Sequence, residues 1–242
     1  MKEINLSTIV GCPVGCWYCP QKVLLTAYRR NVRLLTLENL KILLKNIDKD
    51  IIVNFAGVGE NFFNPEFVDM MIYTYNDGRK IGLYSTMQGI DKEKADRLVN
   101  SKIKFETVFF HRYTGENFNR RLFNYGEARF TNEIEIIYRN GDTPDIKSRA
   151  GNLETPDPVF KTGRLRCDHF DKDLVFYENT MLPNGDLYMC CEDFGLKHKI
   201  GNLYEHDYES EEFNIERRRL QMLQSTEGSD IICRKCEYAV QE

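Results

Sequence analysis

Three cysteines near the amino terminus have a spacing suited to iron–sulfur chemistry. Cys12, Cys16 and Cys19 form the pattern Cys-x3-Cys-x2-Cys. Three thiolates can bind three of the four irons of a cubane [4Fe–4S] cluster, which leaves the fourth iron open to an external chelator. The alternative is a structural zinc site that takes a fourth ligand from elsewhere, but three closely spaced cysteines fit tetrahedral closure poorly. The pattern therefore favours a cluster with one reactive iron.

A second group of cysteines lies in the carboxyl-terminal third of the chain. It comprises Cys167, Cys190, Cys191, Cys233 and Cys236. A compact fold could bring four of these thiolates around another metal centre, although spacing alone does not separate zinc from an iron–sulfur cluster. The start of the chain lacks the features of a signal peptide, so we expect a cytoplasmic protein, in which disulfides are rare.

The elements that must position these cysteines alternate between short apolar runs and helical patterns. Such alternation predicts parallel β/α units, and we expect a full or partial barrel whose chemistry lies at the carboxyl ends of the strands. The expected strands are residues 3–7, 51–55, 80–85, 107–111 and 133–138. The expected helices begin at a cap or a proline and span residues 36–47, 64–78 and 91–99.

Polar residues follow several of these strands. Gly57 and Gly59 would expose backbone carbonyls in a turn, and Glu60 beside them would complement a positively charged amine. Ser85 and Thr86 end the third strand and could bind a ribose, although strand-end hydroxyls are often simple turn caps. His111 ends the fourth strand and would point to the same mouth, or serve only a structural role.

The texture of the sequence changes between residues 140 and 163, which contain several prolines and glycines and no clear periodicity. We expect a boundary near residue 155. Beyond it, residues 174–177 and 187–190 predict a hairpin around Asn184-Gly185, and residues 211–224 predict a charged helix.

Bulk charge excludes some partners. The chain has 242 residues and a net charge of −4, and its basic residues are scattered among acids. This distribution gives no electrostatic footprint for nucleic acid, and no apolar run is long enough to span a bilayer.

The cysteine pattern, with Tyr18 at the aromatic position before the last cysteine, resembles the defining motif of the radical S-adenosylmethionine (SAM) superfamily. The resemblance implies an α/β fold, with a partial (β/α)6 barrel core over residues 1–155. It also implies that Cys12, Cys16 and Cys19 hold a cluster that cleaves SAM to a 5′-deoxyadenosyl radical. The implied SAM-binding residues are Tyr18, Gly57, Gly59, Glu60, Ser85, Thr86 and His111. Asn61 stands where the resembling segment usually has proline.

Residues 156–242 resemble the twitch domain, a shortened SPASM extension with small α+β architecture. By that likeness Cys167, Cys190, Cys233 and Cys236 would hold one auxiliary [4Fe–4S] cluster. The layout is most similar to twitch-type dehydrogenases that oxidise an amino-cyclitol alcohol, 2-deoxy-scyllo-inosamine. On that resemblance Arg149 would meet hydroxyl or phosphate oxygens of the substrate, and Glu192 would bind its hydroxyl or amine groups, although either could be a surface ion pair.

The favoured function is dehydrogenation of a secondary alcohol in a small polyhydroxylated substrate, with electrons supplied by a flavodoxin- or ferredoxin-type reductant. One alternative is epimerisation, in which Cys191 returns a hydrogen atom to the opposite face. Modification of a ribosomally made peptide is a second alternative, although no peptide-recognition segment precedes the expected first strand. A zinc-stabilised binding protein is the non-enzymatic alternative.

Overall fold

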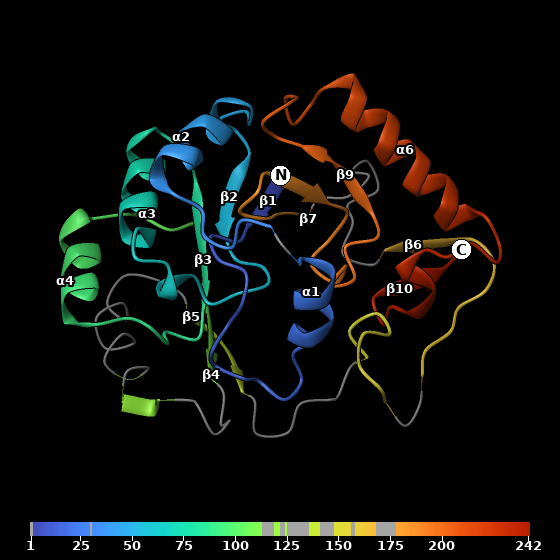
Figure 1. The fold of residues 1–242 in the computed structure, drawn as a ribbon, viewed down its shortest axis with the longest axis horizontal. Coiled ribbons are helices and arrows are strands. Elements are labelled where there is room, and N and C mark those ends of the chain that lie inside the picture. Colours follow the sequence, from blue (N-terminus) through green and yellow to red (C-terminus); the bar gives the residue numbers. More distant parts are fainter. Residues whose placement is uncertain are drawn as a thin grey trace.

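A parallel sheet forms the centre of the molecule (Figure 1). The structure is a computed structural model, and it describes residues 2–29, 31–112, 119–121, 124, 136–140, 148–155, 158–167 and 178–242. The strands of the first half are β1 (Glu3–Leu6), β2 (Ile52–Phe55), β3 (Ile81–Ser85), β4 (Thr107–Arg112) and β5 (Ile136–Asn140). They pair in parallel with their neighbours in the order β5-β4-β3-β2-β1. The predicted partial β/α barrel is confirmed, and the described strands do not close into a ring.

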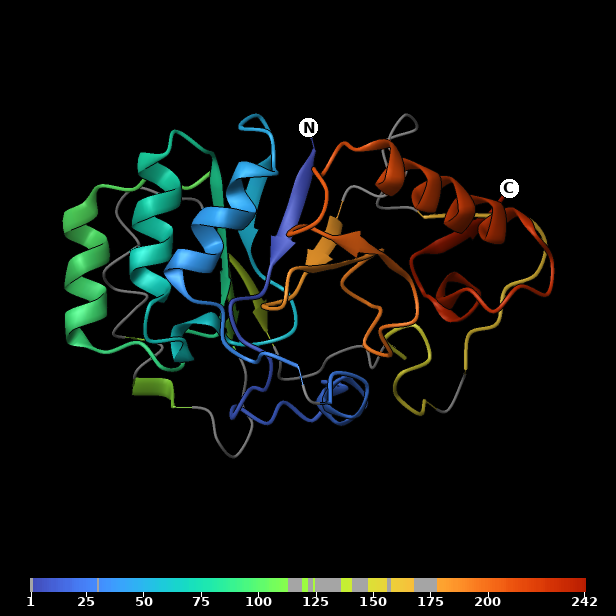
Figure 2. The same cartoon turned by 45° about the horizontal axis from the view of Figure 1, so that its top comes forward.

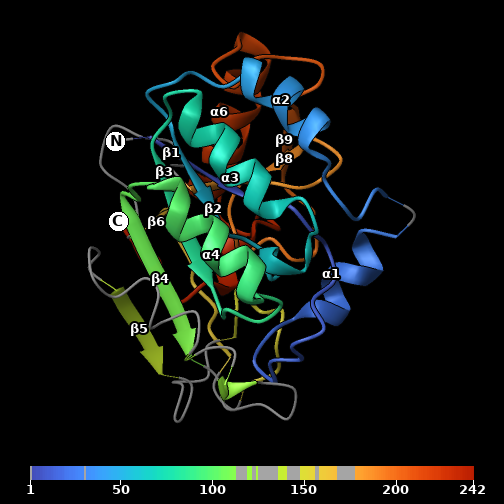
Figure 3. The same ribbon diagram turned by 90° about the vertical axis from the view of Figure 1, so that its left-hand side faces the viewer.

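Helices cover the outer face of this sheet. They are α2 (Leu37–Lys45), α3 (Phe67–Asn76) and α4 (Lys92–Ser101), whereas α1 (Gln21–Ala27) stands apart at the carboxyl ends of the strands (Figures 1 and 3). Two predicted caps are confirmed: Thr36 accepts from the Asn39 N–H, and Asp91 accepts from the Lys94 N–H. The predicted start of α3 at residue 64 is wrong, because Asn64 uses its amide to bind two backbone carbonyls. Helix α1 was not predicted.

Alternation along the strands divides the sheet into two faces. Ile4 and Leu6 of β1 are fully buried in the core beneath the helices, as are Val108 and Phe110 of β4. Each fully buried aliphatic side chain of this kind stabilises the fold by about 1.5–3 kcal/mol. The intervening residues therefore face the opposite side of the sheet, where they line a cavity.

The carboxyl-terminal part continues the same sheet. Strand β7 (Glu178–Met181) pairs in parallel with β1, opposite β2, and the antiparallel strands β8 (Asp186–Tyr188) and β9 (Lys199–Asn202) follow (Figure 2). Helix α6 (Glu211–Ser225) and the 3-10 turn η2 (Ile232–Lys235) come next, and β6 (Leu165–Cys167) pairs with β10 (Ala239–Gln241). The predicted helix is confirmed. The predicted second hairpin strand, residues 187–190, is displaced, because β8 ends at Tyr188. The predicted first hairpin strand, residues 174–177, lies outside the described residues. The first three residues of the predicted strand 133–138 also lie outside them.

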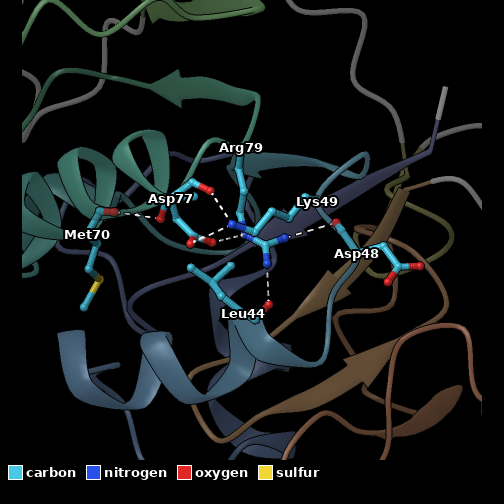
Figure 4. A network of polar contacts seen from close by, with 7 residues as sticks. Leu44, Asp48, Lys49, Met70, Asp77 and Arg79 are labelled. Carbon is cyan, nitrogen blue, oxygen red and sulfur yellow. Dashed lines mark hydrogen bonds and ion pairs between the residues drawn. The ribbon is translucent and has the colours of Figure 1, made fainter.

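A polar network ties the helices together at the end of the sheet opposite the cavity (Figure 4). The buried Arg79 donates to Asp77 Oδ2 at 2.9 Å and to the carbonyls of Leu44 and Asp48 at 2.5 and 3.1 Å. Lys49 donates to Asp77 Oδ1 at 3.0 Å, and this bond and Arg79 hold the pKa of Asp77 below its ordinary value. The network joins the end of α2 to the end of α3 and therefore serves the fold.

None of the helices in the described ranges is long and apolar enough to cross a membrane.

Candidate active site

A cavity of about 640 Å³ lies where the strands of the sheet end and the carboxyl-terminal segment packs against them. Most of the site residues predicted from the sequence line this cavity. The predicted residues that line it are Cys12, Cys16, Tyr18, Cys19, Gly57, Gly59, Glu60, Ser85, Thr86, His111, Arg149, Cys167, Cys190, Cys191, Glu192 and Cys236. Cys233 is buried and does not line it. The fold thus brings both cysteine groups to one space.

The first cysteine loop follows β1 and is fixed at its base by a returning segment. The Val10 N–H donates to the Arg33 carbonyl and the Leu35 N–H donates to the Thr8 carbonyl, both at 2.9 Å. Within the loop, the Cys19 N–H donates to the Cys16 carbonyl at 3.0 Å. The loop therefore turns back on itself at the mouth of the cavity.

The three thiols of this loop influence one another. Burial, with a smaller contribution from Cys19, raises the pKa of Cys12 to about 11 and that of Cys16 to about 12. Metal binding must therefore displace a proton from each sulfur. A cubane cluster takes its thiolates on separate irons, so three cysteine thiolates from one loop suit three of its four irons.

The turn after β2 presses closely on the segment before Cys12. A Cβ atom added to Gly57 would lie 2.1 Å from Ser7 Oγ, and one added to Gly59 would lie 2.5 Å from the Ile9 carbonyl oxygen. Ser7 donates its hydroxyl to the Ala56 carbonyl at 3.1 Å and accepts from the Val58 N–H at 2.8 Å. Both glycines are therefore needed for this close approach.

Replacing Gly59 with alanine is expected to push the turn away from the Ile9 backbone. Overpacking of this kind costs about 1–3 kcal/mol, and each kcal/mol lowers the melting temperature of a chain of this size by about 2–4 °C. Calorimetry measures the shift. Gly195→Ala is the matched control, because its added Cβ would meet nothing nearer than 3.7 Å. Equal melting temperatures for the two variants would contradict the assigned packing.

Glu60 is buried at the edge of the cavity, only 4% exposed. Ser85 donates its hydroxyl to Glu60 Oε1 at 2.8 Å, and Thr86 donates both its N–H and its hydroxyl to Oε2 at 2.6 Å. Burial raises the pKa of Glu60 above its ordinary value, although these hydrogen bonds oppose the shift. A cationic ligand group beside this carboxylate would favour its ionised form. The predicted contact of Ser85 and Thr86 with a ribose stays a prediction.

Asn61 has a role that sequence reasoning missed. It is fully buried, and its Oδ1 accepts from both the N–H and the hydroxyl of Thr8 at 2.8 Å. Asn64 donates its Nδ2 to the carbonyls of Thr8 and Leu35 at 2.9 and 2.8 Å. The two asparagines clamp the Glu60 turn to the strand that leads into the cysteine loop. Only the departure from proline at position 61 signalled this.

Arg149 lies between the two cysteine groups. Its Nη1 is 3.1 Å from Glu192 Oε1, and its guanidinium lies 5.4 Å from the centre of the Phe194 ring. Burial lowers the pKa of Arg149, but the charges of Glu192, Cys191 and Cys19 outweigh this and raise it overall. The influence of Cys19 and Cys191 places the guanidinium near both groups.

A strained turn presents this arginine. Arg149, Ala150 and Gly151 all have left-handed backbone, with φ of 52°, 53° and 76°. Asn152 Nδ2 donates to the carbonyls of Arg149 and Glu192 at 2.6 and 2.9 Å, which binds the two segments together. Strained non-glycine residues of this kind persist where surrounding contacts hold them, and they are frequent in functional sites.

The second cysteine group converges from three separate segments. Cys167 ends β6 opposite Ala239 of β10, Cys190 follows β8, and Cys233 and Cys236 lie on and after η2. Burial raises the pKa of Cys236 to about 12, with further contributions from Cys233 and Cys167. Cys191 and Cys233 likewise add to the effect of burial on Cys190. The four cysteines of the predicted auxiliary set therefore lie near one another, and their role as ligands stays a prediction.

Other residues that line the cavity carried no clear signal in the sequence. Tyr84 and Phe109 stack with ring centres 4.7 Å apart and form an apolar wall. Gln21, at the start of α1, donates to the Val58 carbonyl and also hydrogen-bonds the Cys19 side chain. Glu3 lines the cavity from β1 and accepts from Asn54 Nδ2 at 2.6 Å.

Comparison with known proteins places this geometry in context. A family model described as "Radical SAM superfamily" matches residues 6–141, which include the first cysteine loop and the Glu60 turn. No curated protein matches the chain.

Several solved structures are similar in fold. The crystal structure of BtrN in complex with AdoMet and 2-DOIA has a TM-score of 0.71 at 16% identity and covers 98% of this chain and 93% of that one. Streptococcus suis SuiB bound to precursor peptide SuiA has a TM-score of 0.61 at 11% identity, with 97% and 69% covered. Native anSMEcpe with bound AdoMet has a TM-score of 0.53 at 12% identity, with 98% and 86% covered.

Proposed function

The chain belongs to the radical SAM superfamily, and on that premise we propose that it dehydrogenates a secondary alcohol of a small polyhydroxylated, sugar- or cyclitol-like substrate. The observation that carries the proposal is the shared cavity: two cysteine groups line it, and the Arg149–Glu192 pair lies between them. The fold similarity to BtrN bound to AdoMet and 2-DOIA over 98% of this chain supports the same substrate class. Residues 156–242 would form the twitch-type domain.

The chain's own residues would divide the work around the cavity. Cys12, Cys16 and Cys19 would hold the first cluster, and Cys167, Cys190, Cys233 and Cys236 would hold the second. When bound, these groups and SAM would supply a 5′-deoxyadenosyl radical and an electron acceptor. Glu60, oriented by Ser85 and Thr86, would bind the ammonium group of SAM. The side chains of Tyr18 and His111 would flank the same ligand.

Arg149 and Glu192 would hold the substrate at the reacting carbon. The guanidinium offers donors to hydroxyl oxygens, and the Glu192 carboxylate accepts from a hydroxyl or an ammonium group. After a hydrogen atom leaves the carbon, the hydroxyl must lose a proton and the substrate one electron to become a ketone. The Glu192 carboxylate is the acceptor that we assign to this proton. The walls of the cavity would shield the bound substrate from water while the radical exists.

Transfer of a labelled hydrogen tests the proposal. The anaerobically reconstituted chain would be reduced and incubated with SAM and 2-deoxy-scyllo-inosamine that carries deuterium at each carbinol carbon. We expect deuterium in 5′-deoxyadenosine and an equal amount of ketone. Cleavage of SAM without label transfer from this or related cyclitols and sugars would refute the substrate class.

Epimerisation is the second candidate, because Cys191 lines the cavity near Arg149. Replacing Cys191 with alanine separates the two reactions. Under our proposal the ketone still forms at a rate within about threefold of wild type, since substitutions that remove no ligand and no transition-state contact change rates little. Loss of product with continued SAM cleavage would instead favour epimerisation. Mass spectrometry of the product gives the answer.

Peptide modification has a weaker basis. The similarity to SuiB bound to its precursor peptide supports it, but the chain covers a smaller part of SuiB, 69%, than of BtrN. Addition of unmodified candidate peptides to the same labelling assay distinguishes this class.

A further inference from the structure

The outer side of the first cysteine loop is exposed and carries an unusual charge. Residues 4–37 contain four basic residues, Lys22, Arg29, Arg30 and Arg33, and no acid, although the whole chain has a net charge of −4. Lys22, Arg29 and Arg33 are exposed, and none of the three forms an ion pair with any residue in the described ranges. By contrast, the exposed Lys49, Lys80 and Lys92 have acidic partners in Asp77, Glu106 and Asp96.

Apolar side chains stand among these cations. Trp17 is 52% exposed, Val32 is 55% exposed and Leu34 is 44% exposed. We call the surface formed by these three residues with Lys22, Arg29 and Arg33 the α1 face. Exposed aromatic and aliphatic residues ringed by charge are typical of a surface that binds another molecule.

The α1 face lies directly outside the first cysteine loop. Trp17 is between Cys16 and Cys19, and Lys22 is three residues beyond Cys19. Arg33 and Leu34 run beside residues 9 and 10, through the bond from the Val10 N–H to the Arg33 carbonyl and the bridge between Ile9 and Leu34. In Figure 3, α1 projects from the side of the molecule away from β4 and β5. The α1 face therefore adjoins the loop that carries the three thiols.

We propose that the α1 face is the docking surface for an acidic one-electron carrier protein that reduces the first cluster. The inference rests on the cluster assigned to Cys12, Cys16 and Cys19 under the proposed function. Unpaired cations would attract an acidic partner over a distance of about 8–10 Å at physiological salt. The exposed Trp17, Val32 and Leu34 would then provide the apolar contact at short range. The electron enters from the carrier, and the cluster gains it without bond breaking.

The test compares two double charge reversals in the reconstituted holoenzyme. Lys22→Glu with Arg33→Glu alters the α1 face, and Lys92→Glu with Lys104→Glu makes the same charge change on and beside α4. Photoreduced flavodoxin and a photoreduced [2Fe–2S] ferredoxin, both acidic, serve as carriers. Stopped-flow bleaching of the cluster absorbance measures reduction, with photoreduced 5-deazaflavin as a small reductant that needs no docking.

We expect the α1-face variant to be reduced about 10- to 100-fold more slowly by at least one carrier at low salt, as loss of electrostatic steering predicts. The rate at which 5-deazaflavin reduces the α1-face variant should stay within about twofold of the wild-type rate. The rates at which the carriers reduce the α4 control variant should do the same. Equal rates for the two double variants with both carriers would overturn the proposal. A second result would also overturn it. If the wild-type protein sedimented with phosphatidylglycerol vesicles and Lys22→Glu/Arg33→Glu abolished this sedimentation without changing the reduction rates by the carriers, the face would bind a membrane.

This outcome is separable from that of the proposed function. Reduction of the cluster requires neither SAM nor substrate, so a salt-dependent, charge-sensitive rate supports the docking surface even where no cyclitol is oxidised. Failure to form ketone in the labelling assay would then count against the substrate alone.

Discussion

A chain in which Cys16 is replaced by alanine is expected to lose SAM cleavage. Cys16 stands at the centre of the loop, and both Cys12 and Cys19 act on its thiol. Loss of an outer-shell partner of a metal ligand already costs about 10- to 100-fold in affinity or activity, and loss of a ligand should cost more. We therefore expect 5′-deoxyadenosine formation to fall by more than about 100-fold, as measured by chromatography after anaerobic reconstitution.

Iron content separates this effect from misfolding. The Cys16→Ala protein should keep about half of the wild-type iron, because the second cysteine group is intact, and its melting temperature should stay close to that of wild type. Full iron content together with wild-type SAM cleavage would disprove the assignment of the first loop.

Replacing Cys236 with alanine is expected to abolish ketone formation while SAM cleavage continues. Cys236 lies among Cys233, Cys167 and Glu192, whose charges add to the effect of burial on its pKa. Without this thiolate the second cluster would be lost or labile, and the substrate radical would have no electron acceptor. Ketone formation should fall by more than about 100-fold while SAM cleavage stays within about tenfold of wild type.

Two further variants make this result decisive. Cys167→Ala removes another member of the same group from a different segment and should give the same uncoupling. Cys191→Ala leaves the predicted ligands intact and should keep full iron content. Unchanged iron in both Cys236→Ala and Cys167→Ala would show that the group holds no cluster.

The regular elements of the first half were predictable because local patterns and tertiary packing agree there. Thr36 and Asp91 cap the predicted helices, and strand β2 is buried along its whole length. Helix α1 was missed because it has only 7 residues, lacks a side-chain cap and buries only Leu24. Asn64 looked like a helix start, but its amide is engaged by two carbonyls from distant segments.

The candidate site shows the same division. Cysteines and the Gly57-to-Glu60 turn have recognisable spacing, so the sequence pointed to them directly. Asn61, Gln21 and the Tyr84–Phe109 wall depend on contacts between residues far apart in the chain. The orientation of Glu60 by Ser85 and Thr86 likewise appears only once β2 and β3 lie side by side.

The pairing of β1 with β7 bears on how the protein is made. Strand β1 leaves the ribosome before β7, and its partner residues on one edge, such as Asn179 opposite Ile4, emerge about 175 residues later. Until β7 is synthesised, the first cysteine loop follows a strand that is unpaired on one edge. Contacts between residues so far apart in the sequence form slowly. If iron bound to the first loop during translation, the carboxyl-terminal residues that line the cavity would still be missing. We therefore expect cluster insertion to follow synthesis, and truncation before residue 178 to yield a chain that keeps neither cluster nor sheet.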